Sequence, residues 1–269
     1  LGKPNITEIS NILNVANQIG ICQLDTAQGY GQAEELIGQL SEHRFEINSK
    51  ITLPETDEPP SPSDILSQID NSLKALKSRN LKALYIHNPN VLMGEQGGLY
   101  WEIINSAKSQ GLFSQLGYSV YEPSQLDKLY SQYRPDIVQL PVNAFDSRFQ
   151  LSGWVDRIKK DKVELHIRSI FLQGLLLMAP NERPKYFSNW RQTFALWDKQ
   201  VLEAQVTKLE ACFGAINHLP INAKLIVGVQ NAKQLEAVAY ALGQAKDLSF
   251  QFRTKNHAEL IDPRRWPTF

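Results

Sequence analysis

The sequence predicts an α/β fold, and more narrowly a (β/α)8 TIM barrel that lacks its first strand in this chain. Short apolar segments typical of buried strands alternate with amphipathic helical segments along the 269 residues. No change in composition divides the chain, so we expect a single barrel domain over residues 1–269. Seven segments have a strand pattern, whereas a closed barrel needs eight. We expect the chain to be incomplete at its N-terminal end; the alternatives are a barrel that is open here or another segment in place of the first strand.

The first half of the chain alternates helix and strand three times. Helices with apolar residues at three- and four-residue spacing are expected at 7–19, at 33–40, and from Ser63 or Asp64 to Lys77. Strands are expected at 22–26, 45–50 and 82–87. Each of these strands is expected to be parallel to the next, because a helix separates them.

The second half continues the alternation. Helices are expected at 100–110, 123–132, 154–160, 199–217 and 231–242, and strands at 115–119, 137–140, 163–169 and 224–228. Long loops at 54–62, 90–99 and 175–190 would lie at the carboxyl ends of the strands, where barrels determine specificity. The aromatic residues Tyr186, Phe187, Trp190 and Trp197 could line a substrate pocket there or pack between helices.

Composition excludes several classes of function. The 28 basic and 28 acidic side chains balance, without a basic cluster rich in aromatic residues, so no nucleic-acid partner is expected. No apolar run is long enough to span a bilayer, so no membrane partner is expected. Cys22 and Cys212 lie in apolar patterns and are expected to be buried free thiols in a reducing, cytoplasmic compartment. A small molecule is therefore the expected partner.

Four polar side chains form the candidate catalytic group. Asp25, Lys50 and His87 each end a predicted strand, and Tyr30 follows the first of these strands closely. The ends of neighbouring parallel strands meet at one rim, so these four residues are expected to lie together, although each alone is more simply structural. A nearby ammonium such as Lys50 would lower the pKa of the phenol, and His87 could donate a hydrogen bond to a substrate oxygen.

The same residues resemble the aldo-keto reductases, which are (β/α)8 barrels that transfer hydride from a nicotinamide cofactor to an aldehyde or ketone. The segment Asp25-Thr26-Ala27, with Tyr30-Gly31, Glu34 and Gly38, is similar to the D-T-A-x-x-Y-G-x-x-E signature of the family. Further similar segments follow in the family order and are Asn48–Lys50, Tyr85–Pro89, Gly117–Ser119, Gln139–Asn143, Arg168–Leu176 and Ile226–Gly228. The run from Arg168 resembles a bacterial branch of the family associated with surface-sugar synthesis.

The resemblance implies a role for each matched residue. Tyr30 would be the general acid, completed by Asp25, Lys50 and His87 as a catalytic tetrad. The cofactor would be NADP or NAD, held by the residues Ser119, Gln139, Arg168, Ser169, Phe171, Leu172, Gly228 and Gln234. The sequence departs from the family at Val120 and Val238, where many members have asparagine, and at Gln234 or Gln230, where they have the arginine that binds the 2′-phosphate. Lys233 could substitute for that arginine, so the resemblance does not decide between the two cofactors.

The leading hypothesis is an NAD(P)-dependent oxidoreductase that reduces a small carbonyl compound, with a sugar derivative as one candidate substrate. The alternative is a barrel that binds a cofactor or a partner and regulates without turnover. A metal hydrolase is disfavoured, because the five histidines are scattered without ligand spacing and no metal site is expected.

Overall fold

The protein, described here by a computed structural model covering residues 4–55, 58, 61–217, 219, 223–248, 250 and 257–267, is built around a curved parallel sheet. Seven strands lie in sequence order across this sheet, and each pairs in parallel with the next. The strands are β1 (Gln23–Asp25), β2 (Glu46–Ile51), β3 (Leu81–Ile86), β4 (Phe113–Ser119), β5 (Ile137–Pro141), β6 (Glu164–Arg168) and β7 (Lys224–Leu225). The expected barrel lacking one strand is therefore confirmed.

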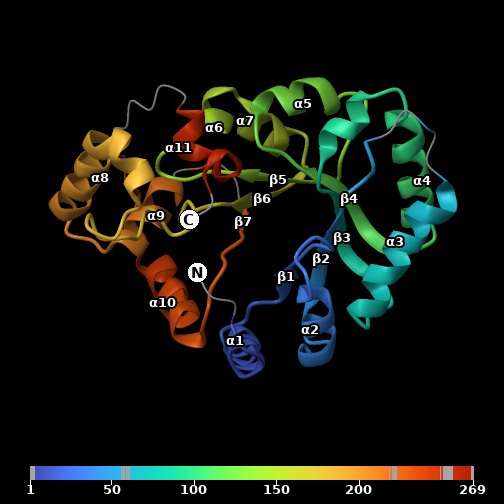
Figure 1. Ribbon diagram of the computed structural model, residues 1–269, viewed down its shortest axis with the longest axis horizontal. Coiled ribbons are helices and arrows are strands. Elements are labelled where there is room, and N and C mark those ends of the chain that lie inside the picture. Colours follow the sequence, from blue (N-terminus) through green and yellow to red (C-terminus); the bar gives the residue numbers. More distant parts are fainter. Residues whose placement is uncertain are drawn as a thin grey trace.

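Helices cover the outer face of the sheet (Figure 1). The longer ones are α1 (Ile6–Gln18), α2 (Ala33–Leu40), α3 (Pro62–Ala75), α4 (Gly97–Ser109), α8 (Arg191–Glu203), α9 (Lys208–Asn217) and α10 (Ala232–Gln244). Shorter helices and 3-10 turns are η1 (Pro89–Met93), α5 (Pro123–Leu129), α6 (Arg148–Leu151), α7 (Trp154–Lys160), η2 (Lys185–Trp190), α11 (Ala258–Ile261) and η3 (Pro263–Arg265). The main hydrophobic core lies between these helices and the sheet, as α3 shows by burying Ile65, Ile69 and Leu73 against it.

The inner face of the sheet is polar. The phenol of Tyr85 on β3 is hydrogen-bonded to His166 on β6, and Gln139 on β5 is hydrogen-bonded to Asp25 on β1. These pairs join strands that are not neighbours in the sheet, so the sheet must curl until its distant strands face each other. These hydrogen bonds hold the polar side chains in fixed positions, so the inner face of the sheet can form a binding site.

Strands β1 and β7 are the two edges of the sheet, and no ladder joins them within the described residues. Helices α1 and α10 lie side by side beneath this seam (Figure 1). Leu13 and Ala16 of α1 pack with Leu235 of α10 and with Phe45 in a second hydrophobic cluster. The outer helical layer therefore closes over the seam, although the sheet itself does not.

Some expected elements differ from the structure. The predicted helix at 199–217 is wrong, because the chain breaks between α8 and α9, where Gln205 adopts a left-handed conformation with φ 54°. Helix α3 starts earlier than predicted, with Ser61 as its N-cap and Pro62 in its first turn, which suits the fixed φ of proline. The expected strand at 224–228 shortens to the two residues of β7. Part of the expected loop at 54–62 lies outside the described residues.

The expected burial of Cys22 is corrected, and the structure decides between the two alternatives for Trp197. Cys22 is exposed rather than buried, because it lies on the edge of the sheet just before β1, whereas Cys212 is fully buried as expected. Trp197 is fully buried and its indole donates to the carbonyl of Leu176, so it packs between elements and does not line a pocket. No helix in the described part of the chain is long and apolar enough to cross a bilayer.

Candidate active site

Asp25, Lys50 and His87 come together at the carboxyl ends of the first three strands. Asp25 is the last residue of β1, Lys50 is the penultimate residue of β2, and His87 follows β3 directly. Backbone hydrogen bonds continue past the strand ends, from Gln28 N–H to Lys50 O and from His87 N–H to Ile51 O. The three side chains are therefore fixed to one rim by sheet-like pairing.

Lys50 is held by a buried ion pair. Its ammonium donates to Oδ1 of Asp25 and, over 2.9 Å, to the carbonyl of Thr26. Burial lowers the pKa of Lys50, and the positive charge of Arg168 adds to this, while Asp25 opposes both. An ammonium buried this deeply depends on its carboxylate partner, so Asp25 fixes the position of Lys50.

Tyr30 lies at the surface of the same rim. Its ring is 49% exposed, its edge meets the ring of His87 with a centroid distance of 5.9 Å, and Lys50 Nζ lies 5.3 Å from its centroid. The loop that carries it turns at Gly31, whose φ of 61° is the left-handed conformation that glycine adopts without strain. The structure thus brings all four predicted tetrad residues together.

The pKa of Tyr30 differs from the expectation. Burial, Asp25 and Tyr121 raise its pKa, and only the charge of Arg168 opposes this, so the expected lowering by Lys50 is wrong for the protein alone. The phenol is therefore protonated at neutral pH and can give up a proton. Burial and the charges of Lys50 and Arg168 lower the pKa of His87, which is therefore neutral and still has one N–H to donate.

Two contacts that orient the rim were missed from the sequence. Asn88 donates to the carbonyl of Leu53 over 2.8 Å and accepts from the N–H of Leu53 over 3.0 Å, which ties the segment after His87 to the segment after β2. The ring of Tyr121 lies 4.0 Å from the Arg168 guanidinium and 3.5 Å from that of Arg264. The strand-end rule could have found Tyr121, which follows β4 closely, but no local signal connects it to Arg264 near the C-terminus.

The predicted nicotinamide-binding residues lie beside the tetrad. Ser119 donates to Oε1 of Gln139 over 3.3 Å, and Gln139 Nε2 donates to Oδ2 of Asp25 over 2.8 Å. Arg168 donates to the carbonyl of Val120 over 3.0 Å. Ser119 and Gln139 are 2% and 1% exposed, so a carboxamide could reach them only if this hydrogen-bonded group rearranged.

The loop after β6 contains four residues in the left-handed conformation. They are Ser169, Leu172, Gln173 and Gly174, with φ between 47° and 82°. Residues other than glycine adopt this conformation at a cost in free energy. The side chains of Phe171 and Leu172 pack into the core, so this loop can offer a diphosphate its backbone rather than these side chains.

The residues predicted for the adenosine end lie at the start of α10. The side chain of Gln234 accepts from the N–H of Gln230 over 2.8 Å, and the backbone N–H of Gln234 donates to the side chain of Asn231 over 2.9 Å, so Asn231 is the N-cap of the helix. Gly228 precedes this turn, and open space lies where a side chain would begin.

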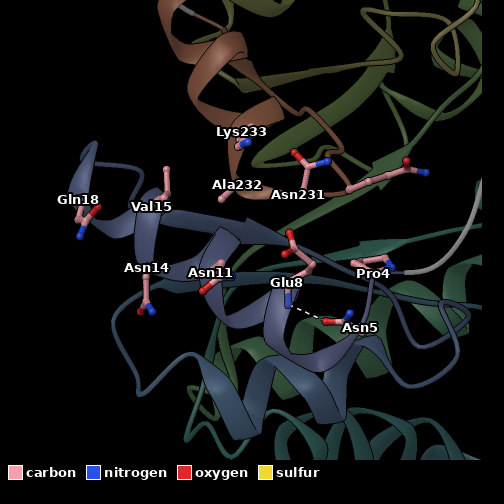
Figure 2. Close-up of a pocket in the computed structure, with 11 residues that line it drawn as sticks. Pro4, Asn5, Glu8, Asn11, Asn14, Val15, Gln18, Asn231, Ala232 and Lys233 are labelled. Carbon is pink, nitrogen blue, oxygen red and sulfur yellow. Dashed lines mark hydrogen bonds between the residues drawn. The ribbon is translucent and has the colours of Figure 1, made fainter.

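A groove of about 750 Å³ runs between α1 and the start of α10 (Figure 2). Figure 2 shows Glu8 and Asn11 from α1 facing Asn231 and Lys233 across it. None of the four tetrad residues lines this groove. Among the described residues, no cluster of three His, Cys, Asp or Glu side chains could hold a metal ion.

Comparison with known proteins agrees with this fold. A model of the aldo/keto reductase family matches residues 2–251. An aldo-keto reductase from Bacillus halodurans has a similar fold, with a TM-score of 0.75 and 20% identity over 93% of this chain and 85% of that one. A glycerol dehydrogenase from Gluconobacter oxydans is similar with a TM-score of 0.68 and 17% identity over 93% of this chain and 90% of the other. A search of curated proteins gives no significant match.

Proposed function

Because the chain belongs to the aldo/keto reductase family, whose members are oxidoreductases acting on carbonyl compounds, we propose that it reduces an aldehyde or ketone at the expense of NAD(P)H. The observation that carries this proposal is the convergence of Asp25, Tyr30, Lys50 and His87 at one rim of the sheet. The family resemblance alone would not require these four side chains to be in contact.

Tyr30 is the proposed general acid. A carbonyl that receives hydride develops negative charge on its oxygen, and a protonated phenol within reach can neutralise that charge. The pKa of Tyr30 is raised, so the phenol carries its proton at neutral pH. His87, whose pKa is lowered, would orient the same oxygen through a hydrogen bond from its neutral ring.

Lys50 and Asp25 act on the acid and not on the substrate. Lys50 Nζ lies 5.3 Å from the ring centroid of Tyr30 and carries the charge that would stabilise the phenolate once the proton has left. Asp25 holds this ammonium in the rim and balances part of its charge. In the protein alone, burial and the charge of Asp25 outweigh this stabilisation, and the pKa of Tyr30 is raised.

The proposed cofactor is NADP or NAD, which supplies the hydride when it is bound. Arg168 and the Ser119–Gln139 pair would hold the nicotinamide end, while the loop at 169–174, which contains four left-handed residues, would bind the diphosphate through its backbone. Gly228 and Gln234 would face the adenosine end. With Gln234 in place of an arginine and Lys233 next to it, we propose that the enzyme accepts both cofactors, without the strong preference that a bidentate arginine gives.

For the substrate we propose a small polar carbonyl compound, with a sugar derivative as the first candidate. The rim around Tyr30 combines aromatic rings, those of His87 and Tyr121, with the charges of Arg168 and Arg264. Aromatic faces suit the C–H groups of a sugar ring, and the cations suit its hydroxyl or acidic groups.

A second candidate function is a barrel that binds the cofactor and regulates a partner without turnover. It is favoured by the burial of Ser119 and Gln139, which already bond to each other and to Asp25. Titration of the protein with NADPH and NADH, followed by cofactor fluorescence, and a panel of aldehydes and sugar carbonyls distinguish the two. Binding with turnover supports the reductase, binding without turnover supports the regulator, and absence of binding contradicts both.

A further inference from the structure

A chain of polar side chains, buried at its inner end, crosses the inner face of the sheet from the tetrad towards the amino ends of the strands. Its members are Gln139 on β5, Tyr85 on β3, His166 and Glu164 on β6, and the outer partners Gln115 on β4 and Lys224 on β7. Barrel interiors of this kind are usually filled by branched apolar residues. A connected polar chain in this place is costly unless each member has its partner, so its arrangement calls for a functional explanation.

Glu164, at the outer end of this chain of polar side chains, determines which groups donate and which accept along it. Burial by itself raises the pKa of Glu164, but hydrogen bonds from Lys224 at 2.6 Å, from Gln115 at 2.8 Å and from His166 outweigh this and lower the pKa to about 2. Glu164 is therefore ionised and can only accept. His166 Nε2, 3.0 Å from Oε1 of Glu164, must then carry the proton and donate it.

The ring of His166 transmits this direction to Tyr85. Burial lowers the pKa of His166 despite the nearby carboxylate, so the ring is neutral and its Nδ1 has no proton. Tyr85 lies with its hydroxyl 2.9 Å from that Nδ1 and must donate to it. The charged and titratable groups that face His166 are Glu164 on its own strand, Tyr85 on β3, Asp25 on β1 and Lys224 on β7.

The inner end of the chain reaches the tetrad through Gln139. Because the Tyr85 proton points to His166, the Tyr85 oxygen can accept from Gln139, whose hydrogen bond opposes the rise of the Tyr85 pKa caused by burial and by Asp25 and Glu164. The same amide donates to Oδ2 of Asp25 over 2.8 Å. Lys50 Nζ lies 5.8 Å from the centroid of the Tyr85 ring, so the ring of this tyrosine lies beside the lysine of the Asp25–Lys50 pair.

We propose that Tyr85 is a positioning residue for the Asp25–Lys50 pair, and that His166 and Glu164 hold its hydroxyl from within the barrel. Without that hydroxyl the Gln139 amide loses one of the two acceptors that set its orientation, and Asp25 is held less firmly. The kinetic effect rests on the proposed reductase function. The hydrogen-bond directions do not depend on it.

The kinetic test compares Tyr85→Phe with Tyr118→Phe. Both tyrosines are fully buried, on neighbouring strands, but Tyr118 lies in the main core and its hydroxyl has no hydrogen-bond partner among the described residues. We expect Tyr85→Phe to lower kcat about tenfold, the factor that corresponds to one ordinary hydrogen bond, with KM for the carbonyl unchanged and the pH profile of kcat displaced. Tyr118→Phe should change none of these. Equal kinetics in the two variants would overturn the proposal.

A second measurement needs no turnover. In protein labelled with ¹⁵N-histidine, comparison with His166→Gln identifies the His166 signals, which should show a neutral ring with its proton on Nε2 at pH 7. Tyr85→Phe should move the Nδ1 signal, and Tyr118→Phe should leave it in place. A charged ring or the opposite tautomer would contradict the polar chain. If no carbonyl is reduced by the wild-type protein, the proposed function fails while this measurement still decides the directions.

Discussion

Gln139 Nε2 lies 2.8 Å from Oδ2 of Asp25, although strands β2, β3 and β4 separate the strands that carry them. This hydrogen bond crosses the inner face of the sheet. It leaves both oxygens of Asp25 engaged, one with Lys50 and the other with Gln139. Gln139, on the opposite side of the barrel, thus helps to hold Asp25 and its ion pair with Lys50 in position.

Tyr30→Phe tests the proposed acid. Removal of the phenolic proton should leave folding intact, because the ring is half exposed, and should lower kcat for carbonyl reduction by at least about 100-fold, the smaller contribution typical of a general acid. The rate of NADPH oxidation with and without a carbonyl measures the effect. Tyr240→Phe, at an exposed tyrosine on α10, is the matched control. Full turnover in Tyr30→Phe would assign the proton to another group.

Glu164→Gln tests the outer end of the polar chain through its effect on stability. The pKa of Glu164 is lowered from 4.5 to about 2, so its contribution is fully present above pH 4.5 and is lost as the pH falls through about 2. We expect the variant to be less stable by roughly 1–2 kcal/mol at pH 7, since its side chain is partly exposed to screening water. The deficit should shrink between pH 4.5 and pH 2.

Urea unfolding of both proteins over this pH range measures the change. Glu203→Gln serves as the control, because Glu203 forms an exposed pair with Lys199 on the surface of α8. A deficit that stays constant down to the lowest pH would show that packing, and not the charge of Glu164, causes it.

Gln234→Arg tests the proposed cofactor tolerance. An arginine at this position can form a charged hydrogen bond with a 2′-phosphate, which we expect to favour NADPH over NADH by roughly tenfold relative to the wild type. Dissociation constants from fluorescence titration give the ratio. Lys233→Gln should change the ratio in the opposite direction. An unchanged ratio in both variants would place the adenosine end elsewhere.

Gly38→Ala tests a close approach between helices. A methyl group at Gly38 of α2 would lie 2.2 Å from the carbonyl oxygen of Ala75 at the end of α3, so backbone atoms would have to move. We expect a loss of about 1–3 kcal/mol in the free energy of unfolding, as for overpacked cores. Gly98→Ala in α4 has open space around the added methyl group and should be neutral or slightly stabilising. Similar stability in the two variants would mean that α2 and α3 separate easily.

Prediction from sequence succeeded where a local pattern has a local cause. Ile65, Ile69 and Leu73 share one face of a helix whatever surrounds it, and the structure buries that face. The prediction failed between α8 and α9. Gln205 adopts a left-handed conformation there, and no glycine or proline beside it indicates that the helix ends. The expected burial of Cys22 was also wrong. Cys22 is exposed because it lies at the edge of the sheet, where no further strand pairs with β1 within the described residues.

The sequence by itself determined the order of the seven strands and the positions of Asp25, Lys50 and His87 at strand ends, with Tyr30 in the loop after the first of these strands. These follow from hydrophobic periodicity and from residue types at fixed spacing, which are properties of short segments. Only the tertiary structure decided that Tyr30 has a raised rather than a lowered pKa, and that Gln139, Tyr85 and His166 form one hydrogen-bonded chain behind it. Burial and contacts across a curled sheet depend on residues far apart in the chain, and no local pattern encodes those distances.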